Sequence, residues 1–422
     1  MSNQPQDVAA TGTVAVAGAG PFEAHEWRRG WTVVAGSMAG IGSGLYMFVT
    51  VFGFFVKPLG AEFGWTRAQI ASSSMAILAA SVLMPVTGLL IDKGRITRVL
   101  AFGAGAFAVA YAAFSMMSGP IWQYYLIVAL IALIGAPCTA PFVFAKPVVR
   151  AFTRSRGLAL GTIMCGVPLL AFAGLPLLAH IIATYGWRSG FLFLVPVSVG
   201  LGTLSYCLMR YSAGPVTTET VKPLAARGAT LREVLGDLRF WLLMVTMAGT
   251  NFSIGVYLSS LQPLLSDKGV SGGTAAFLGA WQGLSVVGSR LLFGAVIDRL
   301  WAPLVGAVGL AAPAAGLFIL YSSGPNAIVL AAGIALIAAA DGAEAGLMSY
   351  LTSRYFGERA FGVVNGVLGG LGSISVAVAG MLAGFAFDHY GNYNLVLLTG
   401  AVLSPIAAIA TLTSGFVKGK WR

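Results

Sequence analysis

The sequence predicts an all-α membrane protein with about twelve transmembrane helices in two pseudo-symmetric halves of six. Three observations predict this fold, namely the composition, the spacing of the apolar runs and an internal repeat. The 422 residues are 57% hydrophobic and 9% charged, whereas a soluble domain carries roughly 25% charged residues. Because a helix needs about 20 apolar residues to cross the hydrocarbon core, a chain of this length accommodates about twelve crossings. The 56 glycines fit helices that pack closely within lipid.

Apolar runs predict the helices in order. In the first half they cover 31–57, 69–91, 99–118, 121–145, 157–183 and 190–209, and in the second half 240–265, 274–297, 301–322, 326–351, 362–387 and 394–416. We therefore expect the following five parts: a disordered cytoplasmic tail (1–26), a six-helix half (27–210), a cytoplasmic central loop (211–238), a second six-helix half (239–416) and a cytoplasmic tail (417–422).

The distribution of basic residues predicts the orientation in the membrane. The formal net charge is +11, but the lysines and arginines lie in the breaks between apolar runs, which argues against a nucleic-acid partner. If the N-terminus is placed inside and the helices alternate, twenty basic residues fall inside and four outside. This asymmetry is the positive-inside pattern. It predicts a multi-pass protein of the inner membrane, monomeric in the lipid bilayer, with both termini in the cytoplasm.

Short strings recur between the halves at nearly one spacing. They are Gly88-Leu-Leu-Ile-Asp92 with Gly294-Ala-Val-Ile-Asp298 (offset 206), Arg150-Ala-Phe152 with Arg354-Tyr-Phe356 (offset 204) and Tyr185-Gly186 with Tyr390-Gly391 (offset 205). Agreement among three separate loops indicates two parallel six-helix repeats. Such repeats are typical of carriers that bind substrate between the halves, near the middle of the bilayer.

Two of these loops resemble a known family. Gly88 to Arg95 (Gly-Leu-Leu-Ile-Asp-Lys-Gly-Arg) resembles the loop 2–3 motif of the major facilitator superfamily, and 294–299 resembles its second copy. The segment 152–166 (Phe-Thr-Arg-Ser-Arg-Gly-Leu-Ala-Leu-Gly-Thr-Ile-Met-Cys-Gly) is similar to the loop 4–5 signature of monocarboxylate porters and the oxalate/formate antiporter group. The resemblance covers about 30–416 and implies the major facilitator fold and a transport function.

Asp92 and Asp298 each end an apolar run beside basic residues. The family resemblance implies that they latch the cytoplasmic side by pairing with nearby arginines and with a helix N-terminus, whose dipole favours an anion. We assign this gating role to five residues: Asp92, Arg95, Arg156, Asp298 and Arg299. The alternative is a pair of solvated carboxylates worth roughly 0–1 kcal/mol.

Arg290 lies eight residues before Asp298, so we expect it roughly 12 Å into the membrane from the cytoplasmic end of its helix. A charge at such depth costs about 2.5–3.5 kcal/mol and indicates a functional site. Its guanidinium matches the geometry of a carboxylate, and the family resemblance implies that an arginine at this spacing binds the carboxylate of the substrate. The alternative is a residue that only pairs or packs neighbouring helices.

Asp341 and Glu344 are three residues apart and therefore share one helix face. Two carboxylates in a site of low dielectric constant resist joint ionisation, so one of them can carry a proton. Pairing with Arg290 and direct contact with substrate are the alternatives. Further polar candidates for the substrate cavity are Tyr46, Asn251, Tyr257, Gln282 and Asn365, and Tyr46 and Phe48 are candidates for stacking on an aromatic substrate.

The sequence contains no Walker-type loop, no cofactor fingerprint and no cysteines at metal-ligand spacing. We therefore expect neither an enzyme nor a cofactor-dependent protein. The preferred hypothesis is a secondary carrier of a small organic anion, a mono- or aromatic carboxylate, that works by proton symport or anion exchange. An efflux carrier of lipophilic or drug-like compounds is the alternative, and a non-transporting membrane sensor is a third class.

Overall fold

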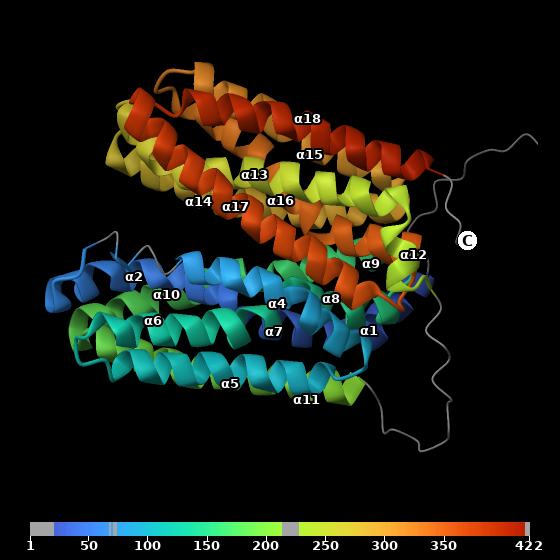
Figure 1. The fold of residues 1–422 in the computed structure, drawn as a ribbon, viewed down its shortest axis with the longest axis horizontal. Helices are drawn as coiled ribbons and strands as arrows, with labels where there is room; N and C mark the ends of the chain where they lie inside the picture. Colours follow the sequence, from blue (N-terminus) through green and yellow to red (C-terminus); the bar gives the residue numbers. More distant parts are fainter. Residues whose placement is uncertain (1–20, 67–68, 71–73, 213–227, 418–422) are drawn as a thin grey trace, which may run out of the picture.

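The computed structural model describes residues 21–66, 69–70, 74–212 and 228–417, and these are almost entirely helical (Figure 1). The first half contains α1 (Pro21–Gly42), α2 (Leu45–Phe63), α4 (Ser74–Asp92), α5 (Ile96–Ser115), α6 (Ile121–Leu130), the π-helical turn η1 (Ile131–Gly135), α7 (Ala136–Cys138), α8 (Pro141–Ala151), α9 (Arg156–Met164), α10 (Gly166–Tyr185) and α11 (Trp187–Ser212). The rest contains α12 (Leu231–Leu235), α13 (Leu238–Asp267), α14 (Gly272–Arg299), α15 (Ala302–Ser322), α16 (Ala327–Phe356), α17 (Phe361–Tyr390) and α18 (Asn394–Phe416).

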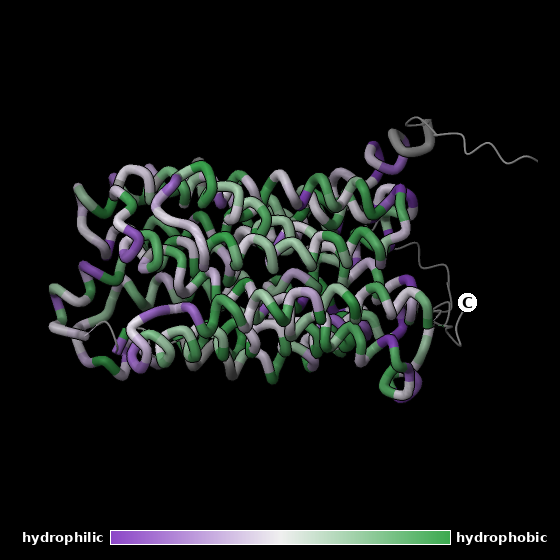
Figure 2. Tube along the Cα trace, turned by 90° about the horizontal axis from the view of Figure 1, so that it is seen from above, coloured by the Kyte–Doolittle hydropathy of each residue, from purple (hydrophilic) through white to green (hydrophobic). Residues whose placement is uncertain are grey.

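The helices account for the predicted membrane crossings. Among the described residues, eleven helical stretches are long and apolar enough to span a bilayer, and α4 adds a shorter apolar stretch, Ala80–Asp92. Hydrophobic residues run along the length of the molecule and many of the hydrophilic ones lie at its two ends (Figure 2). The structure is that of a multi-pass membrane protein. Of the predicted tails and central loop, 1–20, 213–227 and 418–422 lie outside the described residues, whereas α1 already begins at Pro21, within the segment predicted as a tail.

Three of the predicted runs in the first half are interrupted helices. The run 31–57 is divided between α1 and α2 at Ser43 and Gly44. The run 121–145 is divided into α6, η1, α7 and α8, where Pro137 and Pro141 remove backbone donors. The run 157–183 is divided into α9 and α10 at Cys165. The residues at these interruptions, such as Ser43, Thr139 and Cys165, are buried.

Figure 1 shows the helices α1–α11 in one bundle and α13–α18 in the other. The bundles meet where α4 packs against α17 and where α9 packs against α14. Glycines permit this approach: a Cβ at Gly88 would lie 2.1 Å from the carbonyl oxygen of Gly362, and one at Gly157 would lie 2.5 Å from that of Gly294. We call this end of the molecule, where α4 and α14 end and α9 and α17 begin, the latch end. The charge distribution predicts that it faces the cytoplasm.

The segment before α13 is fixed to the latch end. The N–H of Ala229 donates to the carbonyl oxygen of Phe356, at the end of α16. Thr230 and Glu233 then form a reciprocal capping box that starts α12. Hydrogen bonds from the backbone and side chain of Thr230 lower the pKa of the Glu233 carboxyl.

Candidate functional site

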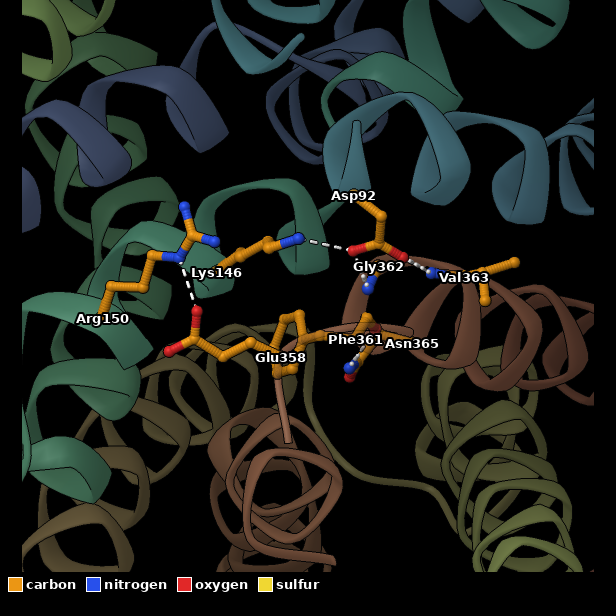
Figure 3. Close-up of polar contacts among 8 residues, drawn as sticks. All are labelled: Asp92, Lys146, Arg150, Glu358, Phe361, Gly362, Val363 and Asn365. Atoms are coloured by element: carbon orange, nitrogen blue, oxygen red, sulfur yellow. Dashed lines mark hydrogen bonds and ion pairs between the residues drawn. The ribbon is translucent and has the colours of Figure 1, made fainter. Parts of the chain in front are cut away.

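Asp92, at the end of α4, joins the two halves at the latch end (Figure 3). One carboxylate oxygen accepts hydrogen bonds from the N–H of Gly362 at 2.8 Å and from the ammonium of Lys146 at 2.6 Å. The other oxygen accepts from the N–H of Val363 at 3.0 Å. Asp92 thus caps the N-terminus of α17, where unpaired N–H groups and the helix dipole favour an anion. We call Asp92, Lys146, Gly362 and Val363 the first latch.

Asp298, at the end of α14, makes the equivalent connection in the opposite direction. Its oxygens accept from the N–H of Gly157 at 2.6 Å and of Leu158 at 2.9 Å, so a carboxylate of the second half caps α9 of the first. We call Asp298, Gly157 and Leu158 the second latch. The two latches are related by the offset of the sequence repeat, about 205 residues.

The arginines assigned to gating occupy different positions. Arg156 donates to the carbonyl oxygens of Val149 and Phe152 and, across the halves, to the hydroxyl of Ser353 at 3.1 Å. Arg95 and Arg299 are exposed, and no ion pair of either is found among the described residues. The cation that pairs with Asp92 is therefore Lys146. An exposed pair, Arg150 with Glu358 at 2.7 Å, lies nearby (Figure 3).

Arg290 lies on α14 between the two halves. One Nη donates to Asp341 of α16 at 3.0 Å, and the other donates to the carbonyl oxygen of Met164 at the end of α9. The Arg290 side chain is 13% exposed and that of Asp341 is 32% exposed, so the carboxylate is the more accessible member of the pair. The Nε of Arg290 is buried and has no hydrogen-bond partner among the described residues. The predicted cation is therefore held by an acidic side chain and still has an unused donor.

The second carboxylate of α16, Glu344, lies in the same region, near Asn251 of α13, whose amide donates to the carbonyl oxygen of Met247. Tyr46 of α2 is 49% exposed and interacts electrostatically with Glu344, Arg290 and Asp341. The structure thus brings candidates from both halves together.

Tyr257 of α13 is 3% exposed and interacts electrostatically with Asp341. Within the part of the chain that the structure describes, its hydroxyl has no hydrogen-bond partner. A buried hydroxyl without a partner is costly, so a second buried donor remains unused near the Arg290–Asp341 pair.

Three further candidates lie elsewhere. Asn365 is buried at the latch end, four residues into α17, where its amide nitrogen donates to the carbonyl oxygen of Phe361 (Figure 3). Its amide oxygen accepts from the hydroxyl of Ser349. Phe48 is 5% exposed and packs among aromatic rings of the first half. Gln282 lies on α14, eight residues before Arg290, and is half-buried.

Two features of the site were not identified from the sequence. Lys146 is expected in an inside loop from charge placement, whereas it lies within α8 and is 4% exposed. A lysine directly after the predicted apolar run 121–145, four residues before Arg150, was the available signal. The second feature is the carbonyl of Met164. Its signal in the sequence is Pro168, four residues later, which has no N–H to donate to that carbonyl.

Two reciprocally latched helical bundles with charged groups between them are typical of a membrane transporter. A sequence profile described as Major Facilitator Superfamily matches residues 38–380. Since this match spans most of the sequence, the chain belongs to the Major Facilitator Superfamily.

Known relatives and structures agree with this membership. The chain is 26% identical over 400 residues to human "Monocarboxylate transporter 11", covering 89% of this chain and 80% of the relative. An uncharacterised 38 kDa protein of Thermoproteus tenax is also 26% identical, with 92% of this chain and 95% of that protein covered. Among solved structures, the transporter FucP in its outward conformation matches with a TM-score of 0.71 at 14% identity, covering 91% of this chain and 98% of FucP. The proton:xylose symporter XylE matches with a TM-score of 0.72 at 14% identity, covering 94% and 97% of the two chains. These structural likenesses concern the fold.

Proposed function

We propose that this chain is a secondary carrier of a small organic anion with one carboxylate, coupled to protons and working by alternating access. The observation that carries this proposal is the Arg290–Asp341 pair between the halves. A buried cation is costly in a membrane, and here it is balanced by a partly exposed carboxylate rather than by a fully enclosed one. A substrate carboxylate has the same chemistry as Asp341 and competes with it for the guanidinium.

In this proposal, protonation of Asp341 allows the substrate carboxylate to replace it on Arg290. When Asp341 takes up a proton, its attraction for Arg290 falls and the guanidinium becomes available to the substrate carboxylate. The proton and the anion together leave the net charge of the site unchanged, so Arg290 has a negative partner before and after the exchange. The groups facing Asp341 that bear on this step are Arg290, Glu344, Tyr46 and Tyr257.

Formation and release of the two latches would close and open the latch end in alternation. With both carboxylate caps formed, access from the latch end is blocked. Placing the latch end in the cytoplasm of an inner-membrane protein makes this the outward-facing arrangement. The name of the human relative supports a monocarboxylate as the class of substrate.

One observation favours the alternative of an efflux carrier for lipophilic compounds. With Arg290, Asp341 and Glu344 all ionised, the site carries one positive and two negative charges, and this surplus suits a cationic compound. Glu344 must then remain ionised when the compound is bound.

Flux into proteoliposomes tests the choice. Uptake of labelled benzoate, lactate and pyruvate should be driven by an inward proton gradient and should be lost in Arg290→Gln. Arg188→Gln is the matched control, because Arg188 is an arginine at the opposite end of the bundle, paired with Glu62. Uptake that persists in Arg290→Gln would contradict the proposal, and competition by lipophilic cations with none by carboxylates would favour efflux.

A further inference from the structure

The contact between Arg290 and the Met164 carbonyl spans the two halves. A carbonyl inside an α-helix normally accepts from the N–H four residues later. For Met164 that residue is Pro168, which has no N–H. The helix is interrupted at this point, between α9 and α10. The carbonyl is therefore left without an intrahelical donor, and the guanidinium of the other half supplies one.

Helix α14 consequently holds α9 at both ends. Asp298 binds the N–H groups of Gly157 and Leu158 at its start, and Arg290 binds the Met164 carbonyl at its end. Eight residues of α14 span roughly 12 Å, close to the length of the nine-residue α9. An anion at the N-terminus and a cation at the C-terminus both complement the dipole of α9.

In the described residues, the first latch has no such second contact. By the repeat offset of 206, the residue of α4 equivalent to Arg290 is Met84, which is apolar and buried. Helix α17 continues without interruption to Tyr390. The guanidinium of the substrate site is thus connected to one latch and not to the other.

We propose that the Arg290–Met164 contact, made possible by Pro168, couples occupation of the substrate site to release of the second latch. This coupling rests on the proposed function, since the anion that binds Arg290 is what draws the guanidinium away from α9. Pro168 is then a positioning residue: it touches no substrate but keeps the carbonyl available. Loss of the contact weakens the hold of α14 on α9 and favours opening at the latch end.

Spin-label distances at the latch end test the coupling without any substrate. Labels at Lys93→Cys and Leu300→Cys, two exposed residues just after α4 and α14, report opening when the native cysteines Cys138, Cys165 and Cys207 are replaced by alanine. Pro168→Ala supplies the missing N–H and Arg290→Gln removes the guanidinium. Each should raise the ratio of open to closed molecules about tenfold, equivalent to 1.4 kcal/mol. Pro176→Ala, in the same helix α10, should leave the ratio unchanged.

A double-mutant cycle separates coupling from a general change in the helix. If both substitutions act through one hydrogen bond, Pro168→Ala combined with Arg290→Gln should open the latch end no further than either alone. Additive effects would show that Pro168 acts only on helix shape and would overturn the inference. Pro168→Gly supplies the same N–H and should reproduce Pro168→Ala if the alanine variant folds poorly.

The outcomes also separate this inference from the proposed function. An unchanged open fraction in Pro168→Ala, together with carboxylate uptake that depends on Arg290, would overturn the coupling alone. A tenfold opening without any carboxylate uptake would overturn the proposed cargo, while the connection between Arg290 and the second latch would stand.

Discussion

The two latches have the same backbone geometry but different side chains around it. In each, an aspartate at the end of one helix caps the N-terminus of a helix from the other half. Asp92 also pairs with the buried Lys146, whereas the residue equivalent to Lys146 at the repeat offset of 204 is Tyr350. The second latch lacks that lysine but is extended by Arg290.

The two latches therefore depend on different cations. The first latch is stabilised by a fixed internal cation that nothing in the substrate site replaces. The second latch is stabilised by a cation that, in the proposed mechanism, also binds cargo. We infer that duplication supplied two similar contacts and that only one became responsive to the substrate site.

The largest expected effect comes from removing the cation of the first latch. Lys146→Met leaves the mostly buried Asp92 without its ion pair, and breaking a buried pair costs about 3–5 kcal/mol. Thermal unfolding should show a clear loss of stability, partly recovered in the double variant Lys146→Met with Asp92→Asn. Arg150→Met is the control, because its exposed pair with Glu358 is worth about 0–1 kcal/mol. An equal loss of thermal stability in Lys146→Met and Arg150→Met would contradict a special role for Lys146.

An intermediate effect is expected where the helices touch. Gly88→Ala places a Cβ 2.1 Å from the Gly362 carbonyl oxygen, and such overpacking costs about 1–3 kcal/mol. Because the clash exists only when the latch end is closed, the label distances should shift toward the open state. Gly105→Ala, which has nothing within 4 Å of the added carbon, should have no effect. A closed latch end in Gly88→Ala would argue against close approach at this glycine.

The smallest effect is expected at the second aspartate. Asp298→Asn removes a charge that caps α9 but leaves an oxygen that accepts a hydrogen bond, at a cost of about 1 kcal/mol. Asp92→Asn should open the latch end further, because it also leaves Lys146 buried without an anion. The label distances compare the two variants directly. A larger opening in Asp298→Asn would reverse the ranking of the latches.

The order of the helices followed from the sequence because twelve apolar runs and a repeated loop are properties of local composition. The interruptions did not follow, since a hydropathy run does not register that Pro137 or Pro168 removes a donor. The position of Asp92 at a helix end was visible, but its partner Lys146 comes from another helix. Spacing likewise gave Arg290 a depth in the membrane, while its contacts with Asp341 and Met164 depend on how α14 packs against α16 and α9. Residue patterns predict helices and candidate positions, whereas the partners of each side chain require the packed structure.

The central claim is that a carboxylate replaces Asp341 on Arg290 when Asp341 is protonated. The direct measurement is the affinity for a carboxylate, such as benzoate, across the neutral pH range in wild type, Asp341→Asn and Glu344→Gln. Because the proposed binding takes up one proton, wild-type affinity should fall as the pH rises, by at most about tenfold for each pH unit. Asp341→Asn should bind independently of pH, while Glu344→Gln should keep the slope. A wild-type affinity that does not change with pH, or a slope that survives in Asp341→Asn, would contradict the account.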